Sequence, residues 1–270
     1  MPSYIDCLKP LAKNGRMLLC DHCGYRTISI GQAAVCSNCE LPIFYSENAL
    51  KASKPIVFSH ASKIYSLVSA RRFDEARKEC DLAYTETGEL GYVYYEGLIS
   101  IMASNDAVDS IEYNKDGFME ENSAFRNTAT KEAVAARRYF NFIINAATLA
   151  GNERSVPPYL LFVSHIKLHN LKEAYEALNL IKSRNTPLLE NYAEMMLQIN
   201  LGSPDSTISA AKKLLSKDAF SVNALYYISE ALADKKHYKE ARQIALALLD
   251  KLPKRQVNRL IWRINSASSI

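Results

Sequence analysis

The stretch that decides the fold runs from Val222 to Pro253 and reads VNALYYISEALADKKHYKEARQIALALLDKLP. Its apolar residues recur every three or four positions in two runs, which predicts two helices joined by a tight turn. The first run is Ala224, Leu225, Ile228 and Leu232, and the second is Tyr238, Ala241, Ala245 and Leu248. Pro253 ends the second helix, because proline lacks an N–H and disfavours a helical residue before it. Two short helices cannot bury both stripes alone, so similar pairs are expected on either side.

A short step at the start of the second helix recurs along the chain. It is found at Tyr238–Ala241, at Phe73–Ala76 and at Leu171–Ala174, each with alanine as its fourth residue. One class of helical repeat has a length of about 34 residues. The separation of Ala174 from Ala241 is close to twice that length, and the separation of Ala76 from Ala174 is close to three times it. The three steps therefore lie nearly in phase with one repeat.

Together with Ser229, a small residue late in the first helix, and the closing Pro253, this pattern resembles a tetratricopeptide repeat. The resemblance covers residues 58–265 and places the helical domain at 56–266. It implies a mainly α protein, an α-solenoid of about five helix pairs. Proteins of this kind usually function by binding other proteins or peptides. The turn at Gly202-Ser203-Pro204-Asp205 fits the pattern poorly.

The remaining helices follow from the same periodicity. Pairs are expected at 60–70 with 73–85, 91–104 with 131–149, 159–169 with 171–184 and 189–201 with 206–217, and a last helix at 255–264. Between 105 and 128 no clear period exists, and six acidic against two basic residues leave a net charge of −4. We read 105–128 as a long acidic surface loop, which either is disordered or contacts a partner.

Residues 16–48 carry the strongest chemical signal. Two Cys-x-x-Cys motifs, separated by 24–35 and flanked by short β-type runs, supply Cys20, Cys23, Cys36 and Cys39. Each motif can direct two thiolates at one ion, so two motifs complete a tetrahedral site. The segment resembles a zinc ribbon or the related rubredoxin-type fold. It predicts one structural Zn²⁺ (iron is the alternative), because four thiolates leave no open position for a substrate.

Three details of the cysteine segment leave alternatives open. Gly24 follows the first motif and suits a left-handed turn, whereas Glu40 takes the corresponding place after the second. His22 lies inside the first motif and could replace a cysteine as ligand, although an exposed side chain is the simpler interpretation. A redox-active Cys-x-x-Cys is disfavoured, since it would need one motif at a strand-to-helix turn.

Two further groups of residues are candidates for binding a partner. From Lys235 to Arg263 nine basic residues oppose two acidic ones, a net charge of +7. They form either a solvated cap or a surface for an acidic protein segment or nucleic acid. The members singled out are Lys235, Lys236, Lys239, Arg255, Arg259 and Arg263. The other group is Tyr92, Tyr94 and Tyr95 on one predicted helix, of which at least one is expected to face solvent as an interface anchor.

The sequence also disfavours several classes of protein. It has no apolar run of about 18 residues, so no membrane insertion is expected. The segment 1–15, interpreted as an arm, lacks the apolar core of a signal peptide, so a cytoplasmic location is expected. The chain contains no phosphate-binding glycine loop, nucleophile elbow or His-Glu-x-x-His motif. The ribbon has only two basic residues, which disfavours nucleic-acid binding there.

These observations predict a non-enzymatic scaffold or adaptor with a zinc ribbon. It would be a subunit of a larger cytoplasmic assembly, such as a secretion apparatus, and would bind one or more proteins. The alternative is a nucleic-acid-associated factor that uses the basic C-terminal helices.

Overall fold

The structure is a computed structural model, and it describes residues 16–29, 33–44, 55–113, 119–149, 156–184, 187–217, 222–249, 251–252 and 254–268. The predicted arm at 1–15 lies outside these residues. The chain divides into two compact units. We call Asp21–Gly24 with Lys51–Leu168 the long-helix unit, and Met1–Cys20, Tyr25–Leu50 and His169–Ile270 the ribbon unit. Among the described residues, no helix has the length and apolar character needed to cross a membrane.

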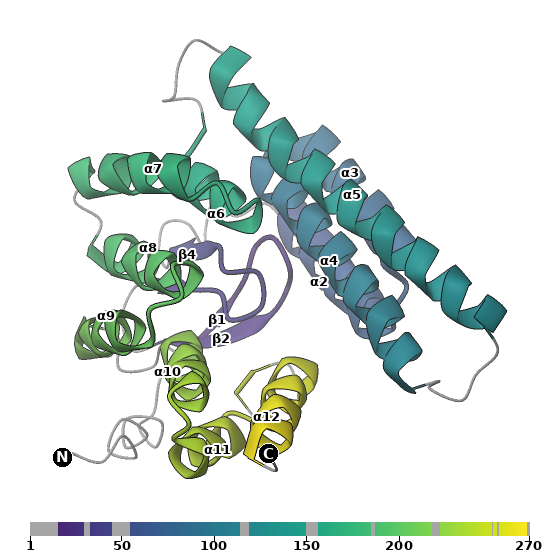
Figure 1. The fold of residues 1–270 in the computed structure, drawn as a ribbon. Helices are drawn as coiled ribbons and strands as arrows, with labels where there is room; N and C mark the ends of the chain where they lie inside the picture. Colours follow the sequence, from purple (N-terminus) through teal and green to yellow (C-terminus); the bar gives the residue numbers. More distant parts are fainter. Residues whose placement is uncertain are drawn as a thin grey trace. The chain divides into compact units, whose positions relative to one another are not determined.

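The long-helix unit contains α2 (Pro55–Ser69), α3 (Phe73–Thr87), α4 (Leu90–Tyr113), α5 (Met119–Leu149) and α6 (Pro158–Lys167). Helices α4 and α5 have 24 and 31 residues and pack along each other (Figure 1). Gly97 allows this close approach, because a Cβ added there would lie 2.6 Å from a ring carbon of Phe140. Every residue from Gly91 to Ser100 is buried, so this part of α4 is enclosed by its neighbours.

The predicted acidic loop at 105–128 is wrong. Helix α4 continues to Tyr113 and α5 begins at Met119, so helix covers the segment except at 114–118, which lie outside the described residues. The sequence pattern failed here because most residues of the segment are polar and leave no apolar stripe. Polar residues such as Glu, Asn and Ser do not prevent a helix whose other turns are packed.

The ribbon unit combines two short hairpins with a row of helices. Strands β1 (Arg16–Leu19) and β2 (Arg26–Ser29) pair antiparallel, as do β3 (Ala33–Val35) and β4 (Pro42–Phe44). The helices are α7 (Leu171–Ser183), α8 (Pro187–Asn200), α9 (Pro204–Lys217), α10 (Val222–Asp234), α11 (Tyr238–Ala247) and α12 (Lys254–Ser268). Each helix from α7 to α11 packs on the next, and β3 contacts α8 (Figure 1).

One turn conformation recurs between helices. A residue with positive φ stands two positions before a helix begins at four places, namely Arg71 (59°), His169 (58°), Gly202 (68°) and Lys236 (64°). Three of the four are not glycine, although the left-handed region is costly for other residues. The last three of these positions follow one another at close to the tetratricopeptide repeat length of about 34 residues. The Gly202 turn, whose sequence fits the repeat poorly, therefore has a left-handed residue at the same place as the other turns.

The hydrogen bonds of these turns are also shared. After three of the left-handed residues, a backbone N–H reaches back five residues to the end of the preceding helix. These bonds are Arg72 N to Leu67 O (2.9 Å), Ser203 N to Gln198 O (3.3 Å) and His237 N to Leu232 O (2.8 Å). Such a bond satisfies carbonyls that a helix end leaves open. The alanines of the recurring step, Ala76, Ala174 and Ala241, are all fully buried, as their pattern predicts.

Candidate metal centre

The four predicted cysteines come together. Cys20, Cys23, Cys36 and Cys39 are each 0% exposed, and their sulfur atoms all lie within 4.8 Å of one another. The Sγ atoms of Cys20 and Cys39 are 3.5 Å apart. A tetrahedral zinc–thiolate site, with bonds of about 2.3 Å, has its sulfurs about 3.8 Å apart. The geometry therefore fits a group that could hold one metal ion.

Both cysteine turns have the same backbone conformation. Gly24 and Glu40, which follow them, have φ of 68° and 62°. Cys20 N donates to Tyr25 O at 3.0 Å, and Cys36 N donates to Leu41 O at 2.8 Å. In the second turn Asn38 N also donates to Cys36 Sγ at 3.4 Å, a bond that favours the thiolate form needed for metal binding. The structure thus places Glu40 in the left-handed position that the sequence suggested only for Gly24.

The first cysteine turn rests on helices of the long-helix unit. His22 Nε2 lies 3.3 Å from a Glu89 carboxylate oxygen, and the His22 ring packs on Tyr92 with 5.5 Å between centroids. The Tyr92 hydroxyl donates to Asp21 O at 3.0 Å. His22 is therefore engaged with α4 and its N-terminal flank, and the group of possible ligands contains the four cysteines without it.

The second cysteine turn rests on helices of the ribbon unit. Asn223, which is 5% exposed at the start of α10, donates to Cys36 O at 3.5 Å and to the Tyr192 hydroxyl at 2.6 Å. The Tyr227 hydroxyl donates to a Glu40 carboxylate oxygen at 2.8 Å. Desolvation and the Glu40 charge raise the pKa of Tyr227 well above its ordinary value, so the phenol keeps the proton that it donates. The sequence did not identify these supporting residues, because no spacing rule links their positions in the chain to those of the cysteines.

The three tyrosines predicted as partner contacts are interior residues. Tyr92, Tyr94 and Tyr95 are each 0% exposed, so the expectation that one of them faces solvent is wrong. The expectation assumed that only one side of the helix is covered, whereas this part of α4 is buried all round. Tyr92 instead supports the first cysteine turn, and Tyr94 packs against Phe140 with 5.6 Å between ring centroids.

The basic residues of the C-terminal helices are partly neutralised by the chain itself. Lys235 pairs with Asp205, and Arg263 pairs with Glu230 at 2.7 Å and Asp234 at 3.0 Å. Lys236 and Lys239 are exposed, and Arg259 is half-buried. The side chain of Arg255 lies outside the described part of the chain. Among these residues stands Trp262, 63% exposed, which the sequence reasoning missed.

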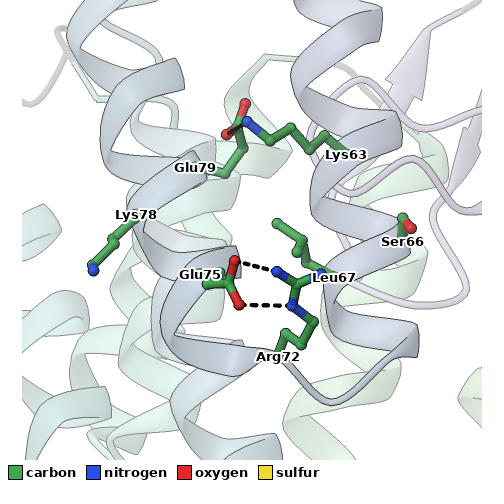
Figure 2. Close-up of a pocket in the computed structure, with 7 residues that line it drawn as sticks. All are labelled: Lys63, Ser66, Leu67, Arg72, Glu75, Lys78 and Glu79. Carbon is green, nitrogen blue, oxygen red and sulfur yellow. Dashed lines mark hydrogen bonds and ion pairs between the residues drawn. The ribbon is translucent and has the colours of Figure 1, made fainter.

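A pocket between α2 and α3 is lined by charges that face each other. It is formed by Lys63, Ser66, Leu67, Arg72, Glu75, Lys78 and Glu79 (Figure 2). Arg72 donates to both carboxylate oxygens of Glu75, at 2.6 and 2.5 Å, and Lys63 pairs with Glu79 at 2.5 Å. Because two of its three cations, Arg72 and Lys63, already bind carboxylates, the pocket is a poor candidate for an anionic ligand.

A buried carboxyl group, Glu96 on α4, supplies a testable pH dependence. Glu96 is 2% exposed, and one of its oxygens has no hydrogen-bond partner in the described part of the chain. Burial, with Asp81 adding to it, raises the pKa of Glu96 from 4.5 to about 9. Between these two values the folded chain holds a proton that the unfolded chain has lost, so stability falls as pH rises.

We therefore expect Glu96→Gln to stabilise the protein at pH 7 by about 1–3 kcal/mol and to flatten the fall in stability between pH 5 and 9. Urea denaturation across that pH range measures both effects. Glu79→Gln is the control of opposite sign. Desolvation would raise the Glu79 pKa, but hydrogen bonds from Lys63 and His60 lower it overall. Losing that carboxylate should therefore destabilise the protein at pH 7. An unchanged or steeper pH dependence in Glu96→Gln would contradict the assignment.

Comparison of the chain with protein-family models, with curated proteins and with solved structures finds no significant match.

Proposed function

We propose that this protein is a non-enzymatic scaffold in which a zinc-bound cysteine ribbon is held by tetratricopeptide-like helix pairs, and that it binds a protein partner within a larger cytoplasmic assembly. The observation that carries the proposal is the helix–helix turn that recurs at His169, Gly202 and Lys236, in a chain that also has a buried four-cysteine cluster. Repeat units with this spacing stack to build binding surfaces.

The ion is proposed to be zinc with a structural role. Thiolate sulfur is a soft ligand that suits zinc or iron, and zinc is the commoner choice for an isolated four-cysteine site. All four cysteines are buried, so a bound ion would have no position for water or substrate. Metal analysis of the purified protein should give close to one zinc per chain.

The surface for the partner is proposed to lie on α11 and α12. In the ribbon unit, the first helices of two successive pairs, α8 and α10, carry Tyr192 and Asn223, which support the second cysteine turn. Helices in these places usually line the groove of a repeat solenoid, and here the chain's own ribbon covers part of them. The exposed Trp262 on α12 offers an aromatic anchor, and Lys236 and Lys239, at the start of α11, add exposed positive charge. An acidic protein segment with an apolar anchor point fits this chemistry.

We expect Trp262→Ala to weaken binding of the partner at least about tenfold, because exposed tryptophans often dominate interfaces. The partner is first identified by co-purification from the native host and mass spectrometry. Its affinity for the wild type and the variant is then compared. Trp262 is the chain's one tryptophan, so its fluorescence can report binding only in proteins that keep it. The affinity of Trp262→Ala is therefore compared with that of the wild type by isothermal titration calorimetry.

Leu201→Ala is the matched control, since Leu201 is 54% exposed at the end of α8 and should leave affinity unchanged. Equal affinity in wild type and Trp262→Ala would contradict the proposed surface. Retained nucleic acid, released with a steep dependence on salt, would contradict a protein partner and favour the nucleic-acid alternative.

A further inference from the structure

We infer that the metal affinity of the cysteine cluster depends on Gly91, a helix residue that ligates nothing, because Gly91 provides the seat on which the first cysteine turn is held. The inference rests on the proposed metal site and extends it to a positioning role for Gly91 and His22.

The seat is a close contact between a side chain and a helix backbone. Gly91 is the second residue of α4 and is buried. A Cβ added at Gly91 would lie 2.2 Å from Cδ2 and 2.3 Å from Nε2 of His22. These distances are far below van der Waals contact, so any larger residue at position 91 must displace the ring. Glycine disfavours a helix, and here its lack of a side chain is what admits the histidine.

His22 transmits this contact to the ligands because it lies between Cys20 and Cys23 in the first cysteine turn. Its ring is fixed on further sides by Glu89 and Tyr92, as described above. Asp21 is held by the Tyr92 hydroxyl. At the other end of the turn, a Cβ on Gly24 would lie 2.4 Å from Ala61 O of α2. Residues on both sides of Cys23 therefore press against α2 or α4.

A ligand pair held in place before the ion arrives binds it more tightly, because less conformational freedom is lost on binding. Metal ligands that depend on a supporting shell typically lose about 10–100-fold in affinity when that shell is altered. The coupling is reciprocal. If the packing of the turn on α4 strengthens metal binding by some free energy, bound metal stabilises that packing by the same free energy.

Gly91→Ala is the test, and Gly97→Ala is its matched control. Both glycines are buried in α4, and both would clash on gaining a Cβ, but the neighbour of Gly97 is Phe140 of α5 at 2.6 Å. Zinc affinity is measured by competition with a chromogenic chelator under reducing conditions, and Tm is measured with and without zinc. We expect Gly91→Ala to bind zinc at least about tenfold more weakly. Gly97→Ala should lower Tm and keep zinc affinity within about threefold of wild type, because its clash lies away from the cysteines.

A double variant and a second single variant distinguish the loss of this specific contact from a general loss of stability. His22→Ala removes the ring that Gly91→Ala would strike, so the double variant should bind zinc as His22→Ala does, and more tightly than Gly91→Ala alone. His22→Ala itself creates no clash and should weaken zinc binding about three- to tenfold, which keeps the inference testable if Gly91→Ala does not fold. Wild-type affinity in either single variant would overturn the inference, as would an equal loss in Gly97→Ala. A wild-type protein that binds no zinc would instead overturn the proposed function.

Discussion

Cys36→Ser should lose the zinc that we propose the cluster binds, and several kcal/mol of stability, while keeping most of its helical signal. A zinc-binding free energy of about 10–16 kcal/mol holds small zinc domains together, and loss of one ligand removes a large part of it. Cys36 is 0% exposed, so its serine replacement also leaves a hydroxyl in a site built for sulfur. The helices should persist, because the buried residues of α7 to α12 pack mainly on one another.

Metal content per chain, circular dichroism and thermal unfolding measure the three parts of this prediction, and Cys20→Ser should behave in the same way. Cys80→Ser is the matched control. Cys80 is also fully buried, in α3, where burial raises its thiol pKa well above the ordinary value. It lies outside the cysteine cluster, so Cys80→Ser should lose some stability and keep its zinc. Full metal content in Cys36→Ser would mean that the ligand set is wrong.

Ala241→Glu should cost more than about 4 kcal/mol and disrupt the ribbon unit. Ala241 is 0% exposed in α11, and its carbonyl accepts a hydrogen bond of 2.7 Å from the Ser229 hydroxyl of α10. The two helix backbones are close at this point, so a glutamate would bring both extra volume and an unpaired charge between them. Each of these is among the few mechanisms that give such large losses.

Gln243→Glu adds the same charge at an exposed position of the same helix and should change stability by less than about 0.5 kcal/mol. Urea denaturation of the two variants and the wild type gives the comparison. A soluble Ala241→Glu protein with full helical signal and wild-type Tm would show that the step from Tyr238 to Ala241 does not lie in a helix–helix contact.

The sequence predicts the parts of this fold that have a one-sided pattern. The periodicity of 222–253 locates α10 and α11, and the spacing of the cysteines is enough to identify a four-sulfur group. Both signals are local and have few competing explanations. Whether the helix pairs form a true tetratricopeptide solenoid is a finer question, which stays a proposal.

Where a pattern is absent or uniform, the sequence interpretation fails. Residues 105–128 show no stripe, yet helix covers both ends of the segment. Tyr92, Tyr94 and Tyr95 belong to a helix segment covered on all sides, so an argument that assumed one buried face wrongly predicted an exposed tyrosine. The contact between Gly91 and His22 could not be predicted from the sequence for another reason. It joins residues 22 and 91, and no spacing rule relates positions so distant in the chain.

The complete burial of α4 from Gly91 to Ser100 also determines which amides are hardest to reach. A helix with a solvent-exposed face can break the hydrogen bonds of one turn locally. The hydrogen bonds of this segment can break only when the helices around it move away. Deuterium should therefore enter the backbone of Tyr94 to Ile99 last in the long-helix unit. Proteases should cut near the exposed Leu149 at the end of α5 well before this segment becomes accessible.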